Sequence, residues 1–186
     1  MDNANLEATL DYVKSRWDIV DCVNRYTRGM DRLDRESALS AFHEDAVLDY
    51  GVFVGSPAEF FDYFSELHRH HHHSTNHMIC NHVCDLDGDA AHTETYFAVA
   101  NNNVGDPPFS LAGGRYVDRF ERRDGRWAIA ARLCIGEWDA TPGNELAETL
   151  IAKFKEVFSI SRDRNDASYR RPLNVDPARI GTNIAV

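Results

Sequence analysis

Seven of the nine histidines in this chain lie in one stretch, residues 68–82, with the sequence HRHHHHSTNHMICNH. Imidazole ionises near neutral pH and binds metals, so such a stretch could hold a metal ion or transfer protons. Consecutive side chains cannot all face one ion, however, and no Asp or Glu in the stretch completes a set of ligands. We interpret residues 68–73 as a solvated segment at a helix end, where positive charge is favourable, with an opportunistic metal-binding patch as the alternative.

The residues from about 74 onward are expected to form a strand, in which successive side chains point to opposite faces. On strict alternation, one face carries His77, Ile79, Asn81 and Val83. The other face then carries Met78, Cys80, His82 and Cys84. Sulfur and imidazole suggest zinc, but alternate strand positions lie about 6.6 Å apart, too far for three ligands of one tetrahedral ion. We interpret the thiols as inert, and Asn81 as a residue that either hydrogen-bonds a ligand beside His77 or ties two strands together.

The overall composition excludes several classes of protein. The chain has 186 residues, a length typical of one domain, and 43% of them are hydrophobic, enough for one core. A formal charge of −10 disfavours nucleic acid and anionic membrane surfaces as partners, since both require a basic surface. No apolar run approaches the roughly 18 residues of a transmembrane helix, and the polar N-terminal stretch is unlike a signal peptide. The four cysteines are expected to be reduced, so we expect a cytoplasmic protein.

Helical periodicity marks the first part of the chain. Between residues 5 and 30, apolar residues recur on one broad stripe of a helix: Leu6, Leu10, Val13, Trp17, Val20 and Val23. Asp34 is a typical N-cap for a short second helix, and residues 46–50 are expected to form a short strand. Ser56 followed by Pro57 predicts the start of a third helix, which continues through Leu67.

Extended stretches dominate the chain from residue 74. Four are predicted, at 74–87, 90–103, 109–123 and 126–139, and the first and third joints have the sequences of hairpin turns. A helix at 144–158 and a polar tail follow. This order predicts an α+β fold, in which a curled, mostly antiparallel sheet packs against the N-terminal helices and forms a cone with an internal cavity. We expect residues 1–160 to form this single domain, and residues 161–186 to pack on it or on a neighbouring subunit.

Several motifs resemble one protein family. They are YTRGMD at 26–31, the spacing of His77 and Asn81 followed by LDGDA at 86–90, GRYVDRFERRDGRW at 114–127 and DASYRRPL at 166–173. Together they resemble the SnoaL-like branch of the nuclear transport factor 2-like superfamily over nearly the whole chain. Members with a similar pattern include scytalone dehydratase, bile acid 7α-dehydratase and hexachlorocyclohexane dehydrochlorinase. The resemblance implies the cone fold, which hosts many different reactions.

The resemblance also implies a set of site residues. In these lyases an Asp at the end of the first long helix pairs with a His on the first long strand, and the matching residues are Asp31 and His77. Tyr26 and Tyr50 match tyrosines that bind or polarise the substrate in the dehydratases. From local sequence alone, Asp31 could equally cap or turn the chain, and Tyr26 could be a core residue.

Arg132 is a further candidate for substrate binding. Related enzymes have an arginine on the last strand, a few positions beyond the place of Arg132. The alternative is a structural ion pair with Asp31 or Glu137.

The expected function is that of a cofactor-independent lyase, a dehydratase that removes water from a hydroxylated cyclic ketone, steroid-like or polyketide-like. A histidine base held by a carboxylate, with a phenol near the carbonyl, suits this chemistry. No metal or nucleotide motif is evident, and we expect neither cofactor. The alternatives are a ketone isomerase or polyketide cyclase of the same fold, and a non-catalytic module that binds a small apolar ligand. We expect a homo-oligomer, a trimer or a dimer, because an open sheet face requires a cover.

Overall fold

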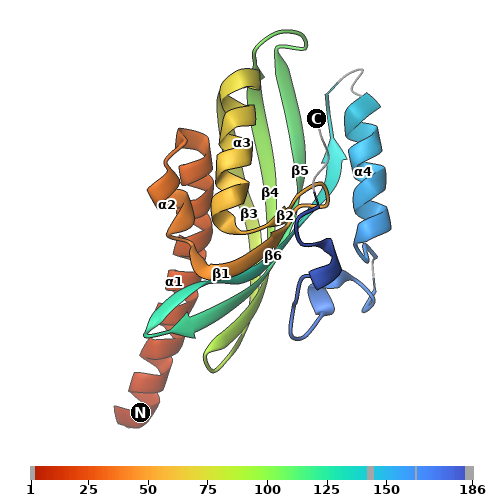
Figure 1. Ribbon diagram of the computed structural model, residues 1–186. Coiled ribbons are helices and arrows are strands. Elements are labelled where there is room, and N and C mark those ends of the chain that lie inside the picture. The colour runs from red at the N-terminus through yellow and green to blue at the C-terminus, as the bar shows by residue number, and fades with distance from the viewer. Residues whose placement is uncertain (1–2, 142–144, 162, 183–186) are drawn as a thin grey trace.

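The computed structural model describes residues 3–141, 145–161 and 163–182, and consists of one curved sheet with helices on both faces (Figure 1). The helices are α1 (Asn3–Arg32), α2 (Arg35–Leu39), α3 (Pro57–His71) and α4 (Glu145–Val157). The strands are β1 (Phe42–Asp49), β2 (Val54–Gly55), β3 (His72–Asp87), β4 (Ala90–Asn103), β5 (Phe109–Arg123) and β6 (Arg126–Asp139). Two short 3₁₀ helices follow, η1 (Ala167–Tyr169) and η2 (Pro177–Arg179). None of the helices in the described ranges is long and apolar enough to cross a membrane.

The six strands follow the order β2-β1-β6-β5-β4-β3, and the sheet does not close on itself. Neighbouring strands are antiparallel except for β1 and β6, which run parallel. Helices α1 to α3 lie on one face, and α4 with the C-terminal segment lies on the other (Figure 1). This arrangement confirms the predicted α+β fold, with a curled, mostly antiparallel sheet against N-terminal helices.

The ends of the helices and strands lie close to the predicted positions, because local signals set them. Ser56 caps α3 in a capping box, and the hairpin turns contain Gly88 and Gly125 with φ angles of 58° and 76°. Two boundaries differ from the prediction. The strand predicted at 46–50 begins four residues earlier, at Phe42, and the end of the third helix lies beyond Leu67. Helix α3 continues to His71 and β3 begins at His72, so the histidine run is divided between a helix and a strand and is not a loop.

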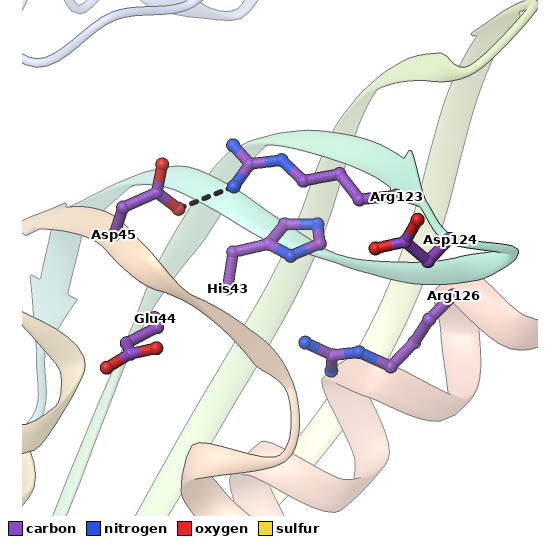
Figure 2. Close-up of a pocket in the computed structure, with 6 residues that line it drawn as sticks. All are labelled: His43, Glu44, Asp45, Arg123, Asp124 and Arg126. Carbon is purple, nitrogen blue, oxygen red and sulfur yellow. Dashed lines mark hydrogen bonds and ion pairs between the residues drawn. The ribbon is translucent and has the colours of Figure 1, made fainter.

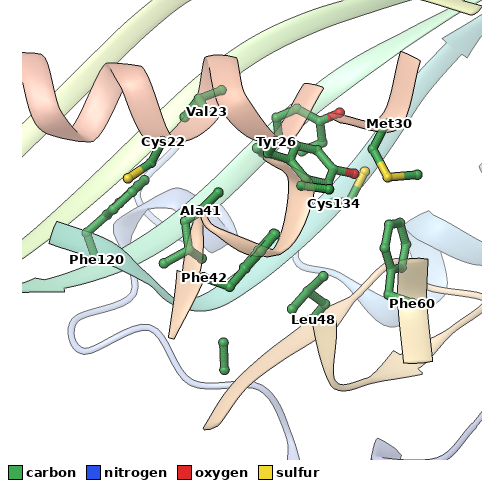
Figure 3. Close-up of a cluster of buried hydrophobic side chains, with 14 of the residues drawn as sticks. Cys22, Val23, Tyr26, Met30, Ala41, Phe42, Leu48, Phe60, Phe120 and Cys134 are labelled. Carbon is green, nitrogen blue, oxygen red and sulfur yellow. The ribbon is translucent and has the colours of Figure 1, made fainter. Parts of the chain in front are cut away.

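The core has two parts, one on each face of the sheet. The inner part lies between the sheet and helices α1 to α3, and its large side chains include Tyr26, Phe42, Phe60 and Phe120 (Figure 3). The outer part lies beside α4 and the C-terminal segment and includes Val117, Leu133, Ile135, Phe158 and Leu173. Both faces of the sheet are covered at β6. Residues 127–135 of this strand are therefore all buried, and most of them are apolar.

Two features position the end of α1, which carries Asp31. Gly29 lies against α2, where a Cβ atom would be 2.4 Å from the backbone nitrogen of Ala38, so only glycine allows this close approach. Leu33 then adopts a positive φ of 53° just after the helix, and Asp34 caps α2. The turn between the two helices is therefore fixed by local chemistry within a few residues of Asp31.

The first turns of α1 extend beyond the sheet (Figure 1). Residues 3–14 are all exposed, and four large apolar side chains of the predicted stripe point to solvent: Leu6, Leu10, Val13 and Trp17. The buried side of α1 carries Ser15, Ile19, Cys22 and Tyr26, with Val23 as the one buried member of the predicted stripe. Periodicity correctly identified the helix, but the first four residues of the stripe that it marked lie on the side of the helix away from the sheet.

Candidate active site

Asp31 and His77 form a hydrogen-bonded pair where the end of α1 meets β3. Oδ1 of Asp31 accepts hydrogen bonds from ring Nδ1 of His77 at 2.6 Å and from Oγ1 of Thr75 at 2.9 Å. Oδ2 accepts one from the backbone N–H of His77 at 2.9 Å. The side chains of His77 and Asp31 are only 9% and 10% exposed, so water competes little for these bonds. The fold thus joins two residues that are 46 positions apart in the sequence.

The charge on Asp31 decides how the imidazole of His77 is protonated. Burial acts to raise the pKa of Asp31, but hydrogen bonds from His77 and Thr75 and the charge of His77 outweigh it, and the pKa lies below its usual value. Asp31 is therefore ionised at neutral pH, and Nδ1 of His77 must carry the hydrogen that it donates. In the neutral ring, Nε2 then holds the lone pair, and it makes no hydrogen bond within the described residues.

Tyr26 and Tyr50 lie together in the inner core, with their hydroxyl oxygens 2.6 Å apart. The ring of Tyr26 meets that of Phe42 edge-on, and the centroid of the Tyr50 ring lies 4.1 Å from that of Phe60. Burial raises the pKa of Tyr26 to about 12, although Arg132 acts to lower it, and raises the pKa of Tyr50 well above its usual value. Both phenols keep their protons at neutral pH and remain hydrogen-bond donors.

Arg132 of β6 pairs with Asp118, its neighbour across the sheet on β5, and both side chains are fully buried. Nε and Nη2 of Arg132 donate to the two carboxylate oxygens at 2.8 and 2.7 Å. The sequence analysis gave Asp31 or Glu137 as the partner of Arg132 in a structural ion pair. This prediction was wrong, because the partner is Asp118. The sequence offered many acidic residues, and only the cross-strand register identifies Asp118.

The guanidinium of Arg132 is also enclosed by aromatic rings. Its central carbon lies 4.1 Å from the ring centroid of Tyr116 and 4.5 Å from that of Tyr26. Its Nη1 is buried and has no hydrogen-bond partner among the described residues. The guanidinium of Arg132 therefore packs against the rings of both Tyr116 and Tyr26, and its Nη1 amino group remains unpaired within the described structure.

Asn81 does not share a face with His77. The pairing of β3 with β4 changes register between Ile79 and His82, where a bulge interrupts the strict alternation. Asn81 is consequently exposed, while His82 points inward with Nδ1 2.8 Å from Oγ1 of Thr95. The prediction that Asn81 accompanies His77 on one face was wrong, because alternation cannot be counted across a bulge.

His68 lies close to the Asp31–His77 pair and was missed by the sequence analysis. It borders a hollow of about 70 Å³ that Asp31 and His72 also line. Its Nδ1 is buried and has no hydrogen-bond partner among the described residues. Burial, with contributions from His72 and His77, lowers the pKa of His68 to about 4. One feature of the sequence could have predicted that His68 faces inward. His68 lies four residues after Phe64 on α3, so the two side chains share one face of the helix, and Phe64 is half-buried.

The other histidines of the run have separate partners. His70 is paired with Glu66 at 2.8 Å on the exposed side of α3, and Nδ1 of His72 lies 2.9 Å from the side-chain oxygen of Asn103. Within the described ranges, no three His, Cys, Asp or Glu side chains are grouped as a metal ion would require. His68 and His72 are neighbours, with ring centroids 5.2 Å apart, whereas His70 lies on the exposed side of α3.

A larger hollow, of about 670 Å³, lies elsewhere, near the start of β1 and the turn between β5 and β6 (Figure 2). It is lined by His43, Glu44, Asp45, Arg123, Asp124 and Arg126. Several of these groups already bind one another or the backbone: Arg123 pairs with Asp45 at 2.6 Å, and Nε2 of His43 donates to the carbonyl of Glu121 at 2.9 Å. A ligand would have to displace these contacts, so the buried pair is the stronger candidate site.

Residues 11–133, more than half of the chain, match the model of a family described as the SnoaL-like domain. The chain belongs to the SnoaL-like domain family. This membership confirms the resemblance seen in the motifs, and the matched range contains Tyr26, Asp31, Tyr50, His77 and Arg132. No curated protein sequence is significantly similar to the chain.

Solved structures with the same fold share little sequence with this SnoaL-like chain. A hexachlorocyclohexane dehydrochlorinase from Novosphingobium barchaimii is 20% identical, with a TM-score of 0.67 over 73% of this chain and 95% of the other. A provisionally named scytalone dehydratase from Novosphingobium aromaticivorans is 18% identical, with a TM-score of 0.64 over 72% and 91%. The Kfla4162 protein from Kribbella flavida is 16% identical, with a TM-score of 0.63 over 69% and 95%. At these identities the similarity shows the nuclear transport factor 2-like fold alone.

Proposed function

We propose that this chain is a cofactor-independent lyase that removes water from a hydroxylated cyclic ketone, steroid-like or polyketide-like. The observation that carries the proposal is the buried pair of Asp31 and His77, with 2.6 Å between Oδ1 and Nδ1. An ionised carboxylate on Nδ1 holds the imidazole in the form whose Nε2 accepts a proton. Histidine is a common general base in enzymes, which suits removal of a proton next to a carbonyl.

The proposed reaction has two steps. His77 takes a proton through Nε2 from the carbon next to the ketone, and the electron pair of the broken C–H bond moves to the carbonyl oxygen. The enolate then reforms the carbonyl, the bond to the hydroxyl one carbon further breaks, and the imidazolium of His77 returns its proton to the leaving oxygen. The products are an unsaturated ketone and water. Asp31 stabilises the imidazolium between these steps.

The two tyrosines are proposed to bind the carbonyl. Their hydroxyls share one hydrogen bond, so one phenol of Tyr26 and Tyr50 has its own hydrogen left to donate. A donor aimed at the oxygen stabilises the enolate as its charge develops. Arg132, whose cation faces the ring of Tyr26, is proposed to hold this ring in place, and its unpaired Nη1 is a second possible donor to a substrate oxygen.

Two alternative functions differ from elimination in ways that can be measured. A ketone isomerase or polyketide cyclase would use the same base but release no water. A non-catalytic ligand-binding module has no need for a hydrogen-bonded Asp31 and His77, and the 2.6 Å contact favours catalysis over this alternative. The names of the dehydrochlorinase and of the provisional scytalone dehydratase both describe eliminations, which supports the lyase proposal.

The test is a screen of cyclic β-hydroxy ketones by mass spectrometry for loss of one water. His77→Ala should abolish turnover while its circular dichroism and unfolding curve stay close to those of the wild type. His70→Ala is the matched control, since this histidine is exposed on α3 and pairs only with Glu66 among the described residues. Full activity of His77→Ala would refute the proposed base. Turnover without change of mass would identify an isomerase or cyclase instead.

A further inference from the structure

The exposed part of α1 carries an apolar stripe that has no cover in the described structure: Leu6, Leu10, Val13 and Trp17. Trp17 is 70% exposed and Leu10 is 59% exposed. Scattered apolar residues are normal on a protein surface, but four large ones on one side of a projecting helix form a contiguous patch. We name these four residues the α1 stripe.

The α1 stripe faces away from the domain. At 3.6 residues per turn, Val13 and Trp17 lie on the side of α1 opposite to Ser15 and Ile19, which are buried against the sheet. The stripe therefore cannot be covered by its own sheet. Residues 3–14 continue helix α1, and Asp11 among them pairs with Arg122 of β5 at 2.7 Å. Their apolar side chains lie on the other side of the helix and would gain stability from a partner that removes them from water.

The spacing of the α1 stripe is that of a helix–helix seam. The intervals from Leu6 to Trp17 are four, three and four residues, which is the pattern of apolar positions in a two-helix coiled coil. In an antiparallel pair of identical helices, Leu10 lies opposite Val13 of the other copy, and Leu6 lies opposite Trp17. Each layer of the seam then combines two large apolar side chains.

The charges beside the stripe are complementary in the same arrangement. Glu7 and Lys14 both follow a stripe residue and flank the same edge of it. Antiparallel pairing brings Glu7 of one copy next to Lys14 of the other, and the two-fold symmetry forms this contact twice. Lys14 is already paired with Asp18 of its own helix at the exposed surface, where such contacts exchange readily.

We propose that the α1 stripe binds the α1 stripe of a second copy of this chain, forming a two-fold dimer through antiparallel helices. The seam is short, so the dimer belongs to the weak, concentration-dependent class of interfaces. This inference is independent of the proposed reaction, because Asp31 and His77 lie at the opposite end of α1.

Sedimentation equilibrium of the whole chain over a roughly hundredfold range of concentration tests the proposal. The mass should rise from one chain to two, and Leu10→Gln combined with Val13→Gln should weaken association at least about tenfold. Tyr12→Gln is the matched control, since Tyr12 is 49% exposed but lies off the stripe. Glu7→Lys alone should also weaken the dimer, and adding Lys14→Glu should restore it.

Three results would overturn the proposal. The first is the mass of a single chain at every concentration, which would show that the α1 stripe does not bind a second copy of the chain. The second is association that the Leu10→Gln and Val13→Gln changes do not affect, which would place the interface elsewhere. The third is a trimer, which a two-fold helix pair cannot form. Circular dichroism of each variant checks that α1 stays helical, since glutamine is a good helix former.

Discussion

Asp31 holds His77 through both of its carboxylate oxygens, one bound to the ring Nδ1 and the other to the backbone N–H. The side chain that sets the proton on the ring therefore also fixes the backbone from which the ring projects. Loss of either contact would change the direction of Nε2. Geometry and protonation in this pair are consequently coupled, and substitutions at Asp31 should affect catalysis more than stability.

Asp31→Asn should lower kcat by roughly 10²- to 10⁴-fold with little change in KM. The amide keeps the shape of the side chain but cannot stabilise an imidazolium, and it can donate to Nδ1 and so favour the wrong tautomer. Steady-state kinetics on the substrate found by mass spectrometry measures the effect. Asp62→Asn, at an exposed pair with Arg35, should leave kcat unchanged. Equal losses in both variants would argue against a specific role for Asp31.

Tyr26→Phe and Tyr50→Phe should each lower kcat by about 10²-fold, because each removes one hydroxyl from the donor pair. The double variant should lose much less than the product of the single losses, since the two hydroxyls act as one unit. Kinetics of the three variants gives the coupling directly. Strictly multiplicative losses would show that the two hydroxyls act independently.

Arg132→Met should destabilise the protein by about 3–5 kcal/mol, because it leaves the fully buried carboxylate of Asp118 without a counter-charge. Combining it with Asp118→Leu should recover much of this loss, since two apolar side chains replace the whole ion pair. Urea unfolding of the single and double variants measures both effects. A single variant as stable as the wild type would contradict the importance of this pair.

His68 should make the free energy of unfolding depend on pH between about 4 and 6.5. The unfolded chain protonates this residue below its ordinary pKa of about 6.5, whereas in the folded protein the pKa is lowered to about 4. Acid therefore favours the unfolded state, and the stability that neutral His68 contributes at pH 7 is lost as the pH falls towards 4.

His68→Gln should reduce the loss of stability between pH 7 and pH 4.5 by roughly 2 kcal/mol relative to the wild type. His70→Gln, at the exposed neighbour, should leave the pH dependence unchanged. Urea unfolding of the three proteins at both pH values gives the comparison. An identical pH dependence in His68→Gln and wild type would show that His68 is solvated in the folded state.

Local sequence determined most of the secondary structure. The capping box at Ser56, the glycines of the hairpin turns and the periodicity of α1 depend on neighbours within a few residues, so their positions could be predicted. The motifs determined the family, and through it the pairing of Asp31 with His77. These signals are short-range or carried by residue identity, and neither requires knowledge of the assembled sheet.

The tertiary structure decided which side chains face one another. The bulge in β3 moved Asn81 to solvent and His82 inward, and the register of β5 with β6 gave Arg132 the partner Asp118. The packing of α1 on the sheet decided that its first turns project beyond the sheet and that Trp17 lies on the side of the helix that faces away from it. Strand register, bulges and the length of a packing surface arise from contacts between distant segments, and periodicity within one segment does not contain them.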